Sequence, residues 1–584
     1  MTQLKPVDVV IAGGGWAGLA MAKEIATRTS LSVVVLERGQ ARGLKEYAEG
    51  MDEVDYAIRL RLMQNIAEET VTHRHSDRVA AVPIRQHGSF NPGTGVGGAG
   101  EHWTAMAYRF LPDQFRLATA LREKHGARGL PADLTVHDWG VGWDELEPHY
   151  WRVEQMMGIG GRAGNLGGRK IEGGNPFEGP RSHEYPNPPH PSTYLGTLFT
   201  KATRDLGYHP FPTPHATLSQ SYRNPDGVTR AGCMYCGYCQ RYGCMIGAKA
   251  QPTNTLLPVL QARRNFTLRT GCWVRRILHR DDRAEGVMYV DQTGAEVEQP
   301  SRIVITASWT LNNSRLLLLS KIGDTYDAVS GKGTLGKNLT HQVSQSTPLF
   351  LDRRLNAFMG AGGLGVTISD LDGDLGLDPS SAVLRGGQIR VSSGGEGPIS
   401  AFGRLPPGES AASWGSAWKK AALDWYDRAS NITSEAEHLP YRHNFVDLDP
   451  TYTDRFGDPL LRLTLDWTDH ERLQAEMIAK AQERIGAAMG ARTAGGARRV
   501  GVRYSTVEYQ SSHVSGGVIM GASPGSSVVN PWLQHWRLPN LWIVGASAFP
   551  QNSSANPTLT LMALASRAAD GLVSRYLKTP GPLA

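Results

Sequence analysis

A glycine-rich turn lies almost at the start of the chain, directly after an apolar, β-branched run over residues 7–12. Its GxGxxG motif consists of Gly13, Gly15 and Gly18, and helix-forming residues follow over 19–26. In dinucleotide-binding folds, a strand, such a turn and a helix follow one another in this order. The glycines permit a tight turn, a close approach of backbone to a pyrophosphate, and helix packing on the strand. The pattern predicts a dinucleotide site, the alternative being a glycine-rich turn without a ligand.

An acidic residue in the right place supports the first interpretation. A second apolar run over residues 32–36 ends at Glu37, and a carboxylate about 20 residues after the glycines binds ribose hydroxyls in such sites. These residues alone leave FAD and NAD both open.

Length and composition limit the class of protein. The chain has 584 residues, 40% of them hydrophobic, which predicts large cores and two or more domains, or a discontinuous pair. The net charge of +6 is spread among acids without a basic run, which argues against nucleic-acid binding. No apolar stretch reaches the ~18 residues that cross a bilayer, and the N-terminus leads into the first strand without a signal peptide. We expect a soluble chain.

Four of the five cysteines gather in one short segment, as Cys233, Cys236, Cys239 and Cys244, with the spacing CxxCxxCxxxxC. This spacing is close to a ferredoxin run, whereas a single zinc usually takes two separated pairs. An iron–sulfur cluster is therefore favoured over structural zinc or free thiols, with three cysteines for 3Fe-4S or four for 4Fe-4S. Cys272 is expected to be a small buried apolar side chain.

Two further stretches have the composition of ligand-binding loops. Residues 88–103 hold many glycines, among them Gly97 and Gly98, and end in His102 and Trp103. Since each glycine costs about 0.5–1 kcal/mol in a helix or strand, we expect a loop against a planar or anionic ligand, or otherwise a surface loop. Near the C-terminus, the segment from His513 to Asn556 holds an HxxGGxxMG motif, a strand that leads to Ala546, and an Asn-Pro-Thr motif.

Hydrophobic periodicity predicts the other elements. The expected helices cover residues 56–72, 133–157, 194–205, 311–319, 467–489 and 560–573, and the expected strands lie within 266–299 and over 302–307. Residues 360–397 are not assigned an element.

Taken together, three blocks resemble the glucose–methanol–choline (GMC) oxidoreductases, flavoenzymes that oxidise alcohols. They are the GxGxxG motif with Glu37, the glycine loop with His102, and the block from His513 to Asn556. Within that family, the cysteine segment and residues 88–110 and 174–182 resemble the flavoprotein subunits of bacterial membrane-bound sugar and sugar-acid dehydrogenases, most of all those that oxidise gluconate.

The resemblance implies the fold and the cofactor. The expected fold is α/β, with a doubly wound FAD domain and a second α+β domain, an antiparallel sheet with helices, over the flavin face. The FAD domain is expected over 1–45, 80–115, 225–345 and 500–584, and the substrate and connecting domain over 46–79, 116–224 and 346–499. A 3Fe-4S cluster is preferred to 4Fe-4S.

It also implies residue roles. His513 is the expected base that accepts the hydroxyl proton, and Asn556 holds that oxygen. His102 falls where some relatives attach the 8α methyl group of flavin covalently. The other expected FAD contacts are Gly13, Gly15, Gly18, Glu37, Gly97, Gly98, Ala546 and Asn556.

The implied activity is oxidation of D-gluconate at the C2 hydroxyl, with sorbitol, fructose, glucose or 2-ketogluconate as alternative substrates. Electrons are expected to leave through the cluster to a multihaem cytochrome c subunit and quinone, and a small subunit carries the export signal. This places the chain at the periplasmic face of the inner membrane, with membrane contact only through a partner, or in the cytoplasm if the partner is absent. The remaining alternatives are a soluble GMC oxidase or dehydrogenase with zinc in the cysteine site, and a non-catalytic flavoprotein.

Overall fold

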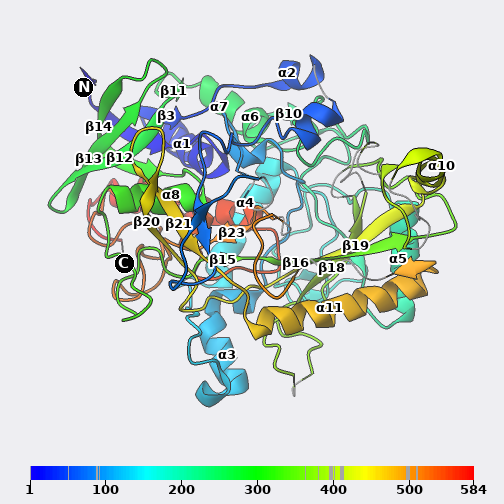
Figure 1. The fold of residues 1–584 in the computed structure, drawn as a ribbon. Coiled ribbons are helices and arrows are strands. Elements are labelled where there is room, and N and C mark those ends of the chain that lie inside the picture. The colour runs from blue at the N-terminus through cyan, green and yellow to red at the C-terminus, as the bar shows by residue number, and fades with distance from the viewer. Residues whose placement is uncertain are drawn as a thin grey trace.

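The computed structural model describes residues 2–49, 52–86, 90, 92–361, 364–378, 381–393, 399, 402–407, 414–494, 500–507 and 511–583. Two large sheets, with helices packed on them, organise the structure (Figure 1). Part of the predicted glycine loop, residues 88, 89 and 91, lies outside the described residues.

The first sheet carries the N-terminal motif. Its order is β11-β3-β2-β14-β13-β12, and β1 and β24 also pair with β14. The strands are β1 (Thr2–Gln3), β2 (Val7–Ala12), β3 (Val33–Glu37), β11 (Phe266–Thr270), β12 (Trp273–Arg280), β13 (Arg283–Val290), β14 (Glu296–Thr306) and β24 (Leu541–Ile543). The pairs that join β11, β3, β2, β14 and β24 are parallel, and β12 and β13 extend the sheet antiparallel. All of β3 is buried, as expected for a continuous apolar run in a central parallel strand.

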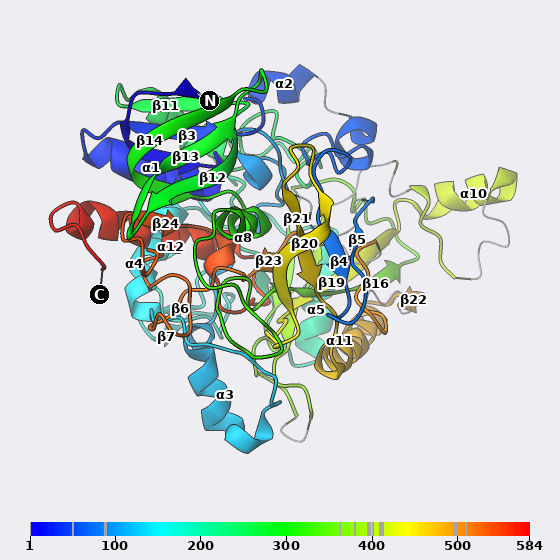
Figure 2. The same ribbon diagram turned by 60° about the vertical axis from the view of Figure 1, so that its left-hand side comes forward.

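Three helices from distant parts of the chain pack together beside this sheet (Figures 1 and 2). They are α1 (Trp16–Arg28), α4 (Trp143–Met157) and α12 (Thr558–Gly571). Helix α1 packs on β2 and β3, and α12 contacts both α1 and α4. Since α12 is rich in fully buried alanines such as Ala563 and Ala565, its neighbours approach closely.

The second sheet is antiparallel throughout, with the order β22-β16-β19-β18-β17-β8. Its strands are β8 (Phe211–Pro212), β16 (Val343–Phe350), β17 (Gly365–Ile368), β18 (Gly387–Ser392), β19 (Ala429–Ala436) and β22 (Thr493–Ala494). Helices α5 (Tyr194–Asp205) and α11 (Asp469–Ala488) pack on it. Residues of β16, β18 and β19 line a cavity.

The remaining elements are short. A four-stranded sheet joins β20 (Phe445–Thr453), β21 (Pro459–Thr464), β4 (Thr72–Arg74) and β5 (Val82–Pro83). Two-stranded pairs are β6 (Asn165–Leu166) with β7 (Arg169–Lys170), β9 (Tyr222–Arg223) with β10 (Thr229–Arg230), and β15 (Thr340–His341) with β23 (Val514–Ser515). The other α-helices are α2 (Leu44–Glu49), α3 (Leu117–His125), α6 (Pro252–Thr255), α7 (Leu257–Gln261), α8 (Thr310–Leu319) and α10 (Gly415–Trp425).

Most predicted elements are confirmed, including the helices at 194–205, 311–319, 467–489 and 560–573 and the strands within 266–299, while the strand at 302–307 is the end of β14. The helix predicted over 56–72 is wrong. Only Val54–Ile58 is helical, as a π-helix, and Leu60 has a φ of 55°. The backbone of Leu62 and Gln64 instead bonds to Thr94 and Pro92 of the glycine loop, at 3.0 and 3.1 Å.

The helix predicted over 133–157 begins ten residues late, at Trp143. Before it, Leu134 forms an isolated bridge with Tyr441, and Gly142 is the N-cap. The unassigned stretch 360–397 contributes β17 and β18, apart from residues outside the described ranges.

No helix within the described ranges combines the length and apolar character needed to span a bilayer. The domain bounds given above stay a prediction, with every strand of the first sheet inside 1–45, 225–345 or 500–584.

Candidate active site

A cavity of about 620 Å³ is lined by residues of both large sheets, a size typical of small-molecule sites. The carboxyl ends of β2, β3 and β14 reach it, which is where open α/β sheets bind ligands. So do the N-terminal residues of three helices, Trp16 of α1, Thr310 of α8 and Thr558 of α12. Because helix N-termini attract negative charge, the cavity suits an elongated anionic ligand.

The predicted glycine motif contributes Gly13 and Gly15 to one wall, and its backbone leaves no room for a side chain at Gly13 or Gly18. Gly13 has a φ of 105°, and a Cβ there would lie 2.5 Å from the carbonyl oxygen of Ala307. A Cβ on Gly18 would lie 2.0 Å from the carbonyl oxygen of Gly13. Gly15 forms a backbone bridge with Gly97 of the glycine loop. This close-packed cradle fits the pyrophosphate of a dinucleotide.

Glu37 ends β3 at the cavity wall, where the sequence places a ribose ligand. Its two carboxylate oxygens accept from the backbone N–H groups of Gly14 and Gly39, both at 2.9 Å, and burial raises its pKa. Gly98 and Ala546 also line the cavity.

His513 lies at the cavity with a defined tautomer. Its Nδ1 is in hydrogen-bond contact with Oε1 of Gln342, while Nε2 of Gln342 donates to the carbonyl oxygens of Ser553 and Ala555. Because an amide oxygen only accepts, Nδ1 of His513 must carry the proton. Nε2 is therefore the basic nitrogen.

Asn556 approaches that nitrogen from the other side. Its Nδ2 lies 3.3 Å from Nε2 of His513, and its Oδ1 is buried with no hydrogen-bond partner within the described ranges. Asn552 donates to the carbonyl oxygen of His513 and fixes the backbone. Burial lowers the pKa of His513, partly opposed by the nearby carboxylate of Glu435. The imidazole is neutral at pH 7, as a general base requires.

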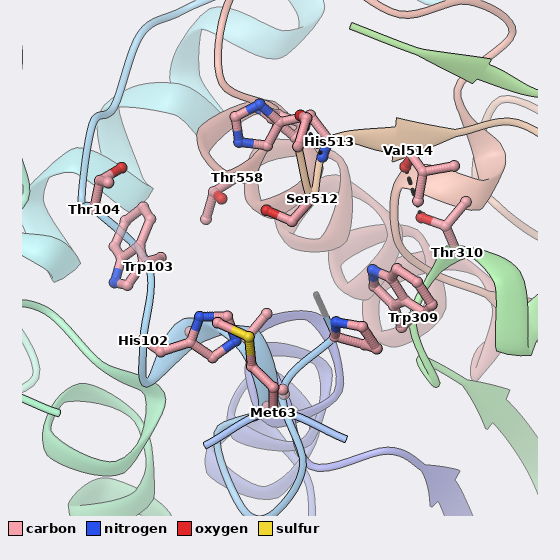
Figure 3. Close-up of a pocket in the computed structure, with 18 of the residues that line it drawn as sticks. Met63, His102, Trp103, Thr104, Trp309, Thr310, Ser512, His513, Val514 and Thr558 are labelled. Atoms are coloured by element: carbon pink, nitrogen blue, oxygen red, sulfur yellow. Dashed lines mark hydrogen bonds between the residues drawn. The ribbon is translucent and has the colours of Figure 1, made fainter. Parts of the chain in front are cut away.

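His102 lies across the cavity from His513 (Figure 3). Its Nε2 is buried and has no hydrogen-bond partner among the residues that the structure describes. Burial, with a contribution from the charge of Lys249, lowers the pKa of His102 to about 3. The site thus holds a second neutral imidazole with a nitrogen free for a ligand.

The cysteine segment is attached to the His102 loop. The backbone N–H of Arg241 donates to the carbonyl oxygen of His102 at 2.7 Å. Nζ of Lys249 contacts the carbonyl oxygens of Glu101, Trp103, Cys239 and Tyr242 at 2.8–3.0 Å. Within the part of the chain that the structure describes, no three Cys, His, Asp or Glu side chains are arranged as metal ligands. Cys272 is buried, as predicted.

Three polar residues around His513 were not predicted. They are Gln342, Glu435 on β19 and Arg390 on β18. Oε1 of Glu435 lies 3.6 Å from Nδ1 of His513 and 3.1 Å from Nη2 of Arg390. Each is a single polar residue with no motif around it, and only the alternation along β18 and β19 could have placed the latter two on the cavity side.

Family comparisons agree with this geometry. A pattern described as FAD binding domain matches residues 8–67, and patterns described as GMC oxidoreductase match residues 219–344 and 440–565.

Two curated relatives cover nearly the whole chain. The gluconate 2-dehydrogenase flavoprotein of Pantoea cypripedii is 38% identical over 100% of this chain and 96% of its own length. The fructose dehydrogenase large subunit of Gluconobacter japonicus is 25% identical over 97% of this chain and 98% of its own length.

Among solved structures, a formate oxidase variant of Aspergillus oryzae gives a TM-score of 0.61 at 14% identity and covers 99% of both chains. A pyridoxine 4-oxidase from Mesorbium loti gives 0.56 at 19% identity, over 96% of this chain and 98% of that one. These likenesses show the fold. The chain belongs to the GMC oxidoreductase family and is an FAD-dependent dehydrogenase that acts on CH–OH groups.

Proposed function

We propose that this chain is the catalytic flavoprotein subunit of a dehydrogenase that oxidises D-gluconate, converting the C2 hydroxyl to a ketone. The 38% identity to a gluconate 2-dehydrogenase flavoprotein supports this substrate. The observation that carries the chemistry is the unprotonated Nε2 of His513 beside Asn556, in the cavity bordered by the glycine motif.

In the proposed reaction, Nε2 of His513 accepts the hydroxyl proton and Asn556 holds the substrate oxygen. Gln342 keeps the other imidazole proton on Nδ1. Bound FAD supplies the hydride acceptor. A positioned base contributes about 10²–10⁴-fold to the rate. The residues proposed to hold FAD are Gly13, Gly15, Gly18, Glu37, Gly97, Gly98, Ala546 and Asn556.

His102 is the proposed covalent attachment point for the 8α methyl group of flavin. Support comes from its buried Nε2, which has no protein partner at the cavity. Mass spectrometry of tryptic peptides that contain His102 tests this. A peptide with the flavin mass is expected, and an unmodified peptide contradicts the attachment.

Cys233, Cys236, Cys239 and Cys244 are proposed to hold an iron–sulfur cluster, 3Fe-4S in preference to 4Fe-4S. A bound cluster would supply a one-electron exit from the site. The bonds of Arg241 and Lys249 support this role, since they attach the cysteine segment to the His102 loop. Iron and acid-labile sulfide analysis distinguishes this proposal from structural zinc, because zinc without sulfide would contradict it.

The proposed electron acceptor is a multihaem cytochrome c subunit, and a small subunit is proposed to carry the export signal to the periplasmic face of the inner membrane. A relative named as a large subunit supports a multi-subunit complex. Co-purification of the chain from its own organism tests this. A haem-containing partner is expected, and an isolated flavoprotein contradicts it.

An anaerobic visible spectrum before and after D-gluconate tests the main proposal. We expect the flavin bands to bleach and 2-ketogluconate to form. The 25% identity to a fructose dehydrogenase large subunit makes fructose the second candidate substrate. Bleaching by fructose, sorbitol, glucose or 2-ketogluconate but not by gluconate would change the proposed substrate and leave the proposed reaction chemistry unchanged.

A further inference from the structure

Arg390 on β18 is a buried cation with bonding capacity that the reaction described above does not use. Its side chain lines the cavity, and the residue is 6% exposed. Nη2 pairs with Glu435 at 3.1 Å, while Nε and Nη1 have no hydrogen-bond partner among the described residues. Since a buried guanidinium N–H without an acceptor is unfavourable, these two groups favour an anionic ligand in the cavity.

Glu435, the partner of Arg390, also has a carboxylate oxygen that the reaction described above does not use. Oε2 of Glu435 is buried without a hydrogen-bond partner in the described part of the chain, and Glu435 lines the same cavity. Burial alone would raise the pKa of Glu435, but the charge of Arg390 holds it below the ordinary value, so the carboxylate is charged. The wall thus offers two donors on Arg390 and one acceptor on Glu435. A carboxylate next to hydroxyl groups has the complementary arrangement.

The position of this pair relative to the base limits which hydroxyl reacts. One oxygen, Oε1 of Glu435, lies 3.1 Å from Arg390 and 3.6 Å from His513. A carboxylate bound by Arg390 therefore lies close to the imidazole that takes the proton. In a sugar acid, the hydroxyl nearest the carboxylate is the one on the adjacent carbon.

Other arginines at the cavity have partners already. Arg38 pairs with Glu69, Arg275 with Asp458, and Arg315 with Asp454. Arg390 differs from these three in that two of its buried N–H groups lack an acceptor among the described residues, and its partner Glu435 lies beside His513.

We propose that Arg390 binds the carboxylate of an α-hydroxy sugar acid through Nη1, while Oε2 of Glu435 accepts a hydrogen bond from a substrate hydroxyl. This assignment rests on the proposed function and names the residue that makes the enzyme select acids over neutral sugars. It also explains why oxidation occurs next to the carboxylate.

The test compares D-gluconate with D-gluconamide, which replaces the carboxylate by a neutral amide. In the wild-type holoenzyme, kcat/KM for gluconate should exceed that for gluconamide by about 10²-fold, the value of a charge-assisted pair. R390M should remove this preference by lowering kcat/KM for gluconate alone. R390K, which keeps the charge but loses the fork, should retain part of it.

Two further variants make the test independent of side effects. R390M leaves Glu435 buried without its cation, so the double variant R390M/E435Q removes both charges and should still lack the preference. R404M changes another arginine that lines the cavity and should keep the preference. Bound flavin and thermal unfolding are measured for every variant.

The outcomes separate the two proposals. Equal rates with gluconate and gluconamide in the wild type, or a preference that survives in R390M/E435Q, overturn the role of Arg390 while gluconate oxidation stands. Loss of the preference in R404M instead moves the carboxylate site to Arg404. A wild-type enzyme that oxidises neither compound refutes the proposed function itself.

Discussion

The tautomer of His513 depends on one amide, and Gln342→Met removes it at nearly constant volume. In the wild type, Oε1 of Gln342 accepts the Nδ1 proton, and its Nε2 is committed to two backbone carbonyl oxygens. Methionine offers no acceptor of comparable strength. The proton is then free to move to Nε2, which would prevent that atom from accepting the substrate proton.

The magnitude follows from the hydrogen bond. Leaving a buried N–H without its acceptor costs about 1–3 kcal/mol, so the reactive tautomer loses a comparable bias. Since each 1.4 kcal/mol is a factor of ten in rate or population, we expect flavin reduction to slow by about 10- to 100-fold at saturating gluconate. The buried carbonyls of Ser553 and Ala555 also lose their donor, so some thermal destabilisation accompanies the change.

Gln482→Met is the matched control. Gln482 on α11 is also fully buried, accepts from Thr347 and donates to the carbonyl oxygen of Gln345. It does not line the cavity. Anaerobic stopped-flow absorbance gives the rate of flavin reduction, and calorimetry gives stability. Q482M should lose stability with an unchanged rate per bound flavin. A Q342M enzyme that reduces its flavin at the wild-type rate would refute the tautomer argument.

Three further predictions concern the pH profile, the cluster and the glycine cradle. Because burial holds the pKa of His513 below 6.5, kcat/KM should be constant near pH 7 and fall at lower pH, where Nε2 becomes protonated. E435Q removes the carboxylate that raises this pKa and should shift the acid limb of the profile to lower pH. An acid limb that stays in place or moves to higher pH would contradict the assignment of His513 as the base. C239S should lower iron and sulfide content and slow electron transfer to an external acceptor, yet leave flavin bleaching by substrate intact. Loss of flavin bleaching together with electron transfer would indicate a structural role for Cys239. G18A places a Cβ 2.0 Å from the carbonyl oxygen of Gly13 and should yield protein with little bound FAD, measured by absorbance, while full FAD content would show that the turn can adjust.

The elements with strong local patterns were predictable from sequence. The first parallel strands and α1 follow from an apolar run, glycines and helix formers, and α5 and α11 follow from periodicity. The helix predicted over 56–72 failed because its buried apolar residues pack with Tyr47 and with Tyr242 of the cysteine segment. The backbone bonds of Leu62 and Gln64 go instead to the glycine loop. Such a competition depends on long-range contacts that periodicity does not record.

The site residues also divide into those that local motifs predict and those that depend on the folded chain. His513, Asn556, His102 and the glycines lie in recognisable motifs, and the structure brings all of them except Gly18 to the lining of one cavity. Gln342, Glu435 and Arg390 act through single side chains from strands of the second sheet or next to them. With 61 Lys and Arg residues, the sequence offers no means of choosing Arg390. Identifying Arg390 requires its burial, its pair with Glu435 and its two unmatched N–H groups, and only the folded chain provides these.

The central claim is that His513 takes the hydroxyl proton while the C2 hydrogen of D-gluconate leaves for the flavin. Anaerobic flavin reduction by D-gluconate, with either hydrogen or deuterium at C2, tests it most directly. The account predicts slower bleaching with deuterium in the wild type, and bleaching at least about 10²-fold slower in H513A. Bleaching insensitive to deuterium at C2, or an undiminished rate in H513A with full flavin content, would contradict it.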